Sequence, residues 1–547
     1  MKTTYVGPEE ITDLETLERE LKERKRLEQI LKEETREGVN TMNRPEKQKN
    51  GFTGLNVNVS KDIVFHPKLE TMEKRKCYKD LRYFLKNKNS VHICGLFGLR
   101  RTGKSILMQQ AAKELLSEGI PCAYIICDDQ HSIFDLKQEI DLLNEQGIRH
   151  VFVDEVDLLE DFMNASHLLS DGISSEVRIV LAATASLQLK LVSLDKLYDR
   201  IYIIPTNYIS LPEHDQLTDI KGPYFYGSSG GTLTEMAIMT GSVFFHGYGA
   251  TYEYVSSSIV DNIIQTLVKQ NRIASGEDRY NEYLTYKEAV YEVLEMQTYE
   301  FVKTILNEVS KSSAAYNFAS DLILPPATYI PDDSFVKIIQ KMLEIMGVIQ
   351  KDEHFLINGN QMERFSAWQE YLFLQPGLLY QMACHELLNI LDQSEFGRLG
   401  YVEKRGLTER LKEQILIHCL KDNIRYDLIS HYSDGYYTES VCKLTDTSSK
   451  TEVPVAIIHK NNVIDLYEIT YQTDIINTAG SRAHSAITNP DFLNNVKRIF
   501  KIGKTAVIYN GETKMFEDPD SNCSIKYINV TEFLQTYNRD FENTELN

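Results

Sequence analysis

Residues 98–105, GLRRTGKS, constrain the fold of this chain more than any other stretch. They fit the phosphate-binding pattern G-x-x-x-x-G-K-[ST] at every fixed position. A mostly apolar run over 91–96 precedes them, and Leu107, Ala111 and Leu115 follow at every fourth position. This order predicts a strand, a glycine-containing loop and a helix.

A loop of this kind is suited to a phosphate chain. Its glycines let the backbone wrap the phosphates, and the N–H groups and dipole at the start of the helix attract negative charge. We expect Lys104 to reach the β and γ phosphates of ATP and Ser105 to hold Mg²⁺. The expected nucleotide contacts are Gly98, Thr102, Gly103, Lys104, Ser105 and Ile106.

A second motif lies fifty positions beyond Lys104, where the apolar run 150–153 ends in Asp154 and Glu155. This is the form of a Walker B strand. Asp154 is expected to coordinate Mg²⁺ through water, and Glu155 to orient and deprotonate the attacking water. The alternative is that the two acids only cap the strand, although burying them without a metal or donors is costly.

The strand and helix patterns continue over 57–214. A further apolar run, 178–183, ends at Thr184, whose polar side chain is placed to sense the γ-phosphate. Strands that alternate with helices predict an α/β fold: a mostly parallel P-loop NTPase sheet, covered on both faces, with the nucleotide at the carboxyl ends of its strands.

The flanking regions have other patterns. Residues 1–56 are dominated first by charge and then by linker residues, so we expect a solvated helix and a flexible linker. Residues 215–395 are rich in helix-period patterns. Within them, 335–358 predicts an amphipathic helix and two short strands that turn at 351–354, as in a winged helix. The acidic turn favours protein packing at least as much as DNA binding.

Charge and composition limit the class of function. The formal net charge of −20 disfavours a protein that coats nucleic acid through its overall field, although a local basic groove stays open. No apolar run approaches the ~18 residues of a membrane span, and no secretory signal is evident, so the cytoplasm is the expected compartment. The eight cysteines form no C-x-x-C pair and several have apolar neighbours, which predicts reduced core residues.

Several segments together resemble a group of bacterial AAA-type ATPases that carry a C-terminal domain of the PD-(D/E)XK nuclease-like kind. In the P-loop region these segments are 98–105 (GLRRTGKS), 153–162 (VDEVDLLEDF), 179–187 (IVLAATASL) and 197–200 (LYDR). Later in the chain they are 226–232 (YGSSGGT), 254–267 (YVSSSIVDNIIQTL) and 374–383 (LQPGLLYQMA). The resemblance implies an AAA-like ATP-binding core at 57–214, a helical region with a winged-helix-like piece at 215–395, and a nuclease-like domain at 396–547.

The resemblance also implies two site residues. Thr184 falls at the sensor position after a core strand, and Arg200 falls at an arginine that could contact a phosphate in its own or a neighbouring subunit. For Arg200, a surface ion pair with Asp199 or Asp195 is an alternative of equal weight. One departure is Ala185, where similar proteins tend to place an acid. This departure bears on how the γ-phosphate is sensed at this position and not on whether nucleotide binds.

The nuclease-like region keeps only part of its expected set. A nuclease of this kind needs a helix glutamate, a strand aspartate and an E-x-K, so that carboxylates hold Mg²⁺ and the lysine orients water. Glu409 or Glu413 can supply the helix acid, and Glu468 the acid of E-x-K. Pro454 stands at the aspartate position and Thr470 at the lysine position. We therefore expect a degenerate domain without nuclease activity, such as a binding module.

These patterns favour an ATPase whose nucleotide state moves the other domains on a macromolecular partner, either a protein or a nucleic acid. The expected catalytic residues are Lys104, Glu155, Thr184 and Arg200, and the expected Mg²⁺ ligands are Ser105 and Asp154. Two alternatives stay open: an ATP-binding switch or scaffold that scarcely turns over, and an ATP-controlled nuclease. Assembly into a homo-oligomer also stays open.

Overall fold

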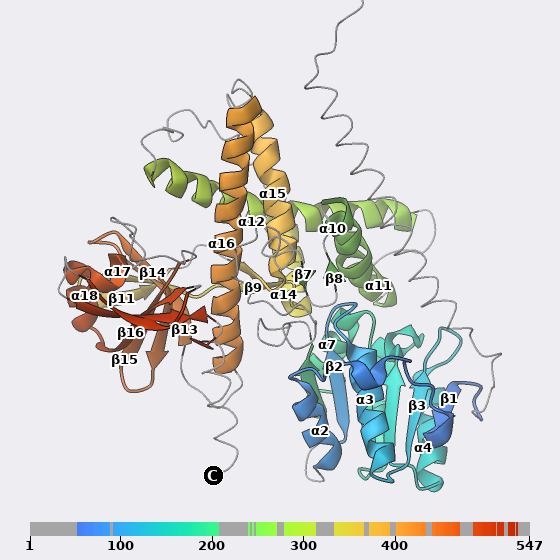
Figure 1. Cartoon of the computed structure of the whole chain (residues 1–547). Coiled ribbons are helices and arrows are strands. Elements are labelled where there is room, and N and C mark those ends of the chain that lie inside the picture. Colours follow the sequence, from blue (N-terminus) through green and yellow to red (C-terminus); the bar gives the residue numbers. More distant parts are fainter. Residues whose placement is uncertain are drawn as a thin grey trace, which may run out of the picture.

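The computed structural model describes residues 52–87, 91–206, 239–240, 243–244, 248–270, 278–312, 333–365, 371–393, 401–433, 440–470, 485–509, 511–518, 523–530 and 532–533. The predicted N-terminal helix, most of the predicted linker and the 226–232 segment lie outside these residues. Figure 1 shows a parallel-sheet core in blue to cyan, a helical region in green to orange above it, and a C-terminal sheet in red to one side.

A six-stranded sheet forms the first part, in the order β1-β3-β4-β5-β2-β6. Its strands are β1 (Asn56–Val59), β2 (Ile93–Phe97), β3 (Cys122–Ile126), β4 (His150–Asp154), β5 (Arg178–Ala182) and β6 (Ile201–Pro205). β1 is antiparallel to β3, and every other neighbouring pair is parallel. The predicted parallel sheet, with its strand, loop and helix around the phosphate-binding motif, is confirmed.

Helices cover both faces of this sheet. In β4, Val151 and Val153 pack with α4 (Ile133–Glu145), whereas Phe152 packs on the opposite face with α3 (Lys104–Ser117). Helix α2 (Tyr78–Lys86) lies on the α3 side. On the α4 side lie α5 (Phe162–Ala165), α6 (Leu168–Asp171) and α7 (Ser186–Leu194). Burial on both faces explains why the inner strands are continuous apolar runs in the sequence.

The helical region packs directly on the parallel-sheet core. One continuous helix combines α10 (Tyr248–Tyr254), the π-helical turn η4 (Val255–Val260) and α11 (Asp261–Lys269). It is followed by α12 (Asp278–Ser312), α14 (Asp333–Met346), α15 (Pro376–Gln393) and α16 (Tyr401–Ser433), and β7 (Met239–Thr240) pairs with β8 (Val243–Phe244). The apolar core of these helices also contains Leu99 of the phosphate-binding loop and Leu187 of α7.

The two strands expected in a winged helix are present but do not pair with each other. β9 (Ile349–Lys351) pairs with β12 (Tyr371–Phe373), whereas β10 (His354–Asn358) pairs with β11 (Gln361–Arg364) and with β13 (Ser440–Asp446). The turn between β9 and β10 therefore connects two sheets and forms no wing. Asp352 in this turn is buried against Arg425 of α16, which fixes the turn in that position.

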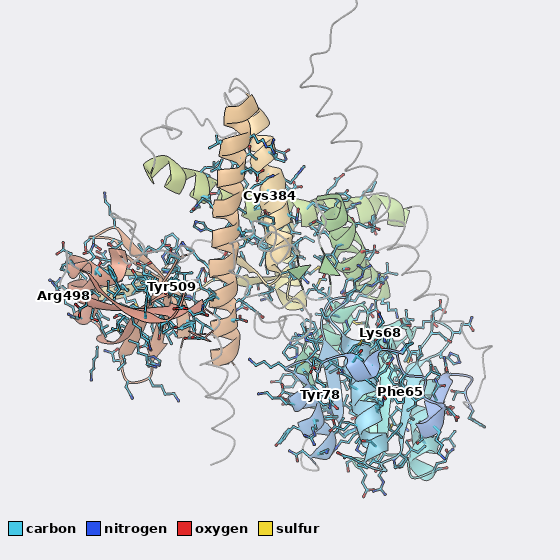
Figure 2. The ribbon with its side chains drawn as sticks, in the orientation of Figure 1. Phe65, Lys68, Tyr78, Cys384, Arg498 and Tyr509 are labelled. Atoms are coloured by element: carbon cyan, nitrogen blue, oxygen red, sulfur yellow. The ribbon has the colours of Figure 1, made fainter. Side chains whose placement is uncertain are left out.

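The C-terminal sheet has eight strands in the order β11-β10-β13-β14-β15-β16-β18-β17. The remaining strands are β14 (Thr451–His459), β15 (Val463–Ile469), β16 (Lys501–Tyr509), β17 (Lys514–Asp518) and β18 (Cys523–Asn529). One face packs on the helical region, and the other packs on α17 (Ser485–Thr488) and α18 (Pro490–Lys497). Figure 2 places Tyr509 within this sheet and Arg498 at its outer side. β10 and β11 precede residue 396, where the sequence pattern places the start of this domain.

The cysteines whose side chains are described are free thiols, and all but Cys77 are buried, as predicted. Within the described ranges, no helix is long and apolar enough to cross a membrane.

Candidate active site at the P-loop

A pocket of about 320 Å³ opens where the carboxyl ends of β2, β4 and β5 meet. The residues that line it are Arg100, Arg101, Thr102, Gly103, Lys104, Ser105, Ile106, Asp154, Glu155, Ala183 and Thr184. β5 lies between β2 and β4, so the three strands deliver both sequence motifs and Thr184 to one edge of the sheet. Apart from Gly98 and Arg200, the predicted site residues all line this pocket.

The loop that precedes α3 has the backbone shape of an anion site. Arg101 and Gly103 adopt left-handed conformations, with φ of 66° and 87°. Left-handed residues that alternate with other conformations turn successive backbone N–H groups toward one side and create an anion-binding concavity. The start of α3 adds the positive end of its helix dipole to the same place.

Lys104 is held beneath the loop by the loop's own carbonyl groups. Its Nζ donates to the carbonyl oxygens of Gly98 at 2.7 Å and Leu99 at 2.8 Å. An ammonium has three N–H groups, so these two bonds leave one N–H for a further acceptor in the pocket. Burial lowers the pKa of Lys104 to about 8, against the opposing pull of the Asp154 and Asp157 carboxylates. Gly98 therefore contributes by positioning the lysine.

Arg75 ties the loop to the edge of the sheet, and sequence patterns did not indicate it. Its buried Nη1 donates to the carbonyl oxygens of Thr102 at 2.7 Å and Thr206 at 3.0 Å. The hydroxyls of these two threonines also share a hydrogen bond of 3.1 Å. Arg75 stands in a basic run with Lys74 and Lys76, and nothing in that run distinguishes the buried side chain from its exposed neighbours.

Asp154 is oriented by two donors. Tyr124 of β3 donates its hydroxyl to Oδ2 at 2.8 Å, and the backbone N–H of Glu155 donates to Oδ1 at 3.1 Å. Burial, reinforced by the charge of Asp154, raises the pKa of Tyr124 well above its usual value, so the phenol remains a donor. The two bonds fix the orientation of the Asp154 carboxyl group at the pocket wall.

The chemistry of the side chains fits Mg²⁺. Ser105 and Asp154 both line the pocket and offer one hydroxyl and one carboxylate. Mg²⁺ prefers oxygen ligands and keeps several waters, and it commonly binds through one or two carboxylates together with the phosphates of a nucleotide. No group of three or more His, Cys, Asp or Glu in the described ranges is arranged to hold a metal. A divalent ion here would therefore depend on phosphate oxygens and water for the rest of its shell.

Glu155 and Thr184 line the pocket just after β4 and β5, respectively. Glu155 is exposed and adopts a left-handed backbone with φ of 56°, directly before the short helix η3 (Val156–Leu158). Such a conformation in a non-glycine residue is costly and is concentrated at functional sites. Thr184 is half-buried, and its backbone N–H donates to the Asp157 carboxylate at 2.7 Å.

Comparison with known proteins agrees with this geometry. Residues 90–214 match a protein family described as "AAA domain". This match covers most of the parallel-sheet core, which we therefore call the AAA domain. No curated protein matches the chain.

Solved structures that resemble the chain include three nucleotide-related proteins. The Walker-type ATPase PABY2304 of Pyrococcus abyssi is 15% identical, with 57% of this chain and 95% of that chain covered and a TM-score of 0.26. The Aeropyrum pernix ORC2 protein, in ADPNP–ADP complexes, is 11% identical, with 60% and 93% covered and a TM-score of 0.26. AMPPCP-bound DnaA from Aquifex aeolicus is 13% identical, with 64% and 98% covered and a TM-score of 0.25.

Arg200 lies outside the pocket of the AAA domain. Its Nη1 donates to the Asp171 carboxylate and to the hydroxyl of Ser170 at 3.1 Å. The side chain is 50% exposed. An ion pair was one of the two expectations for this residue, but the partner is Asp171 and not Asp199 or Asp195. A contact between Arg200 and a phosphate in a neighbouring subunit stays a prediction.

The nuclease-like positions lie outside the AAA domain, on the C-terminal sheet and on α16. Glu468 of β15 accepts a hydrogen bond from the backbone N–H of Ala486 at 3.0 Å, and burial raises the pKa of Glu468 to about 7. Val455 pairs with Tyr467, so Pro454 is next to Glu468 on the adjoining strand. Thr470 directly follows β15. Glu409 is exposed on α16 beside Lys412, and the side chain of Glu413 lies outside those described.

Proposed function

We propose that this chain binds ATP with Mg²⁺ in the pocket of its AAA domain, hydrolyses it, and uses the reaction to move its helical and C-terminal regions on a macromolecular partner. The observation that carries the proposal is the convergence of Lys104, Asp154, Glu155 and Thr184 on one pocket at the carboxyl ends of three parallel strands.

Each residue has a distinct task in this reaction. The backbone N–H groups of the loop bind the phosphates, and Lys104 donates to the β and γ phosphate oxygens. Ser105 and Asp154 would hold Mg²⁺, which when bound neutralises phosphate charge. Glu155 orients the attacking water and accepts its proton, and Thr184 donates to the γ-phosphate. Arg200 would act from a neighbouring subunit, because its own pocket does not include it.

Phosphate release and calorimetry test the proposal. We expect Glu155→Gln to bind ATP but to release phosphate at least about 100-fold more slowly, which is the usual contribution of a general base. Lys104→Ala should lose ATP affinity because the phosphates lose a point charge. Glu176→Gln removes an exposed carboxylate that pairs with Arg149 and should behave as wild type. If neither the wild type nor Glu155→Gln releases phosphate with any candidate partner present, the non-hydrolysing switch is the better description. Equal release at a measurable rate would instead contradict the role of Glu155 as general base.

We further propose that the C-terminal sheet is a binding module without nuclease activity. Pro454 offers no ligand and Thr470 no cation at the positions where an aspartate and a lysine are required, so a metal at Glu468 would lack one ligand and the attacking water would lack its positioning lysine. Labelled single- and double-stranded DNA should remain uncut with Mg²⁺ or Mn²⁺. Cleavage by the wild type that is abolished in Glu468→Ala would contradict this.

A further inference from the structure

A buried carboxylate joins the two segments that carry Glu155 and Thr184. Asp157, in η3, is 2% exposed. Its Oδ1 accepts the backbone N–H of Thr184 at 2.7 Å, and its Oδ2 accepts that of Ala185 at 2.8 Å. Both oxygens are therefore used to bind the loop after β5 to the turn after β4. A displacement of one segment must be followed by the other, or these two charge-assisted bonds are lost.

Helix α11 of the helical region holds the same turn from the other side. Nζ of Lys269 donates to the carbonyl oxygen of Leu159 at 2.7 Å and to that of Asp157. Lys269 is the last residue of α11. Its charge lies beside the Asp157, Glu160 and Asp161 side chains, which compensate part of the cost of its partial burial. Both carbonyl groups belong to the turn, so the two hydrogen bonds of the Lys269 ammonium depend on the position of the turn.

The same helix also holds the segment after β5. Asn262, 4% exposed, accepts the backbone N–H of Leu187 on its Oδ1 at 3.2 Å and donates to the Ser186 hydroxyl at 3.1 Å. Asn262 and Lys269 are two turns apart and so lie on one face of α11. One helix face therefore contacts both segments that bring Glu155 and Thr184 to the pocket, while Asp157 connects the segments to each other. We call these two segments the γ-phosphate end, after the roles proposed for Glu155 and Thr184.

We propose that Asp157, Lys269 and Asn262 form a junction that couples the γ-phosphate end of the AAA domain to the position of α11. Asp157 is the positioning residue for Thr184. Lys269 and Asn262 transmit displacements of the two segments to α11 and so to the helical region. This inference rests on the proposed function, because it needs a nucleotide in the pocket. It goes further by naming the contacts through which nucleotide binding would affect the helical region.

Hydrogen exchange of the backbone amides of α11 tests the junction in the full-length protein. The wild type is compared with and without AMPPNP and Mg²⁺, and binding is checked by calorimetry. We expect the exchange of α11 to slow when AMPPNP is bound, and this difference to disappear in Lys269→Met. Lys269→Arg keeps donors for the two carbonyl groups and should restore it. Lys303→Met removes a lysine of α12 that pairs with Glu300, and it should keep the wild-type difference.

Measurements of kcat and KM distinguish a loss of coupling from a loss of stability. Coupling between two sites commonly changes an equilibrium by about 5- to 150-fold. We expect Lys269→Met and Asp157→Asn to lower kcat by about tenfold or more. KM should stay within about twofold, because the loop and Lys104 are untouched. A structural defect would lower the active fraction alike in Lys269→Met and Lys269→Arg.

The outcomes distinguish the inference from the function on which it rests. If the wild type binds AMPPNP but α11 exchanges at the same rate with and without it, the junction is overturned while nucleotide binding stands. Unchanged turnover in Lys269→Met, as in Lys303→Met, would also overturn it. If the wild type binds no nucleotide, the proposed function and the inference fail together.

Discussion

At the scale of single residues, Lys104 carries its charge where burial disfavours it. Burial lowers its pKa to about 8, yet a phosphate oxygen needs the ammonium form. Bound phosphate raises that pKa again, so ATP binding takes up a proton at high pH. We expect affinity to be nearly constant below about pH 7 and to weaken by up to about tenfold for each unit above pH 8. Calorimetry from about pH 6.5 to 9.5 measures this.

The matched variant for this prediction is Lys104→Arg. Arginine stays protonated over the whole range, so any affinity that the variant retains should not decline above pH 8. The same decline in both proteins would show that another group is responsible.

Glu468 gives a second residue-scale prediction. Burial raises its pKa to about 7 from an ordinary 4.5, so its stabilising contribution is full below pH 4.5 and is lost as pH rises through 7. Glu468→Gln keeps an acceptor for the Ala486 N–H and carries no charge. It should be more stable than wild type by about 1–3 kcal/mol at pH 8 and nearly equal at pH 4.5. Urea unfolding at the two pH values measures the difference.

Glu363→Gln, at an exposed position on β11, is the control for Glu468→Gln and should show no such dependence on pH. A Glu468→Gln protein that is less stable than wild type at pH 8 would mean that the carboxylate has a favourable partner in the folded state.

Sequence patterns predicted the parts of the site that follow from local spacing. Lys104, Asp154 and Thr184 each come at or just after an apolar run that ends in a loop, so the topology of a parallel sheet is enough to bring them together. Arg75 and Lys269 reach the site from distant positions through contacts with backbone carbonyls. Such contacts leave no periodic or compositional signal, because any residue supplies a carbonyl.

At the scale of elements, the strands themselves were predictable from the sequence, whereas the pairing of the short strands was not. β2, β4 and β5 were predictable because burial on both faces makes each a continuous apolar run. β10 was also predicted as a strand, but its neighbour β13 lies about ninety residues further along the chain. A short strand does not specify its partner, since backbone hydrogen bonds are common to all residues. The two strands expected in the wing therefore belong to different sheets, with β9 paired to β12 and β10 paired between β11 and β13.

The turn before β10 depends on a buried ion pair. Arg425 of α16 pairs with Asp352 of the turn, both are less than 10% exposed, and Asp422 lies 3.4 Å from Arg425. Arg425→Met leaves a buried carboxylate without its cation, which should cost about 3–5 kcal/mol. Arg364→Met breaks the exposed pair with Glu353 and should cost less than about 1 kcal/mol. Denaturant unfolding of both variants gives the two values, and equal losses would contradict this account.

At the scale of the whole molecule, the apolar clusters divide the chain differently from the three parts visible in Figure 1. The AAA domain has its own cluster on each face of its sheet. The helical region and one face of the C-terminal sheet share a single cluster, which extends from Tyr254 to Phe533 and also includes Leu99 and Leu187 of the AAA domain. Residues that share a core lose their packing together, so the helical region and the C-terminal sheet should unfold as one unit.

Calorimetry of the full-length protein can test this division. We expect two transitions, one for the AAA domain and one for the combined helical and C-terminal unit. AMPPNP with Mg²⁺ at about 100 times its Kd should stabilise the first by about 2.7 kcal/mol, because only the folded pocket binds it. Arg425→Met should lower the midpoint temperature of the second transition and leave that of the first unchanged. A single transition that responds equally to the nucleotide and to Arg425→Met would mean that the contacts of Leu99, Asn262 and Lys269 across the boundary make one cooperative unit of the entire chain.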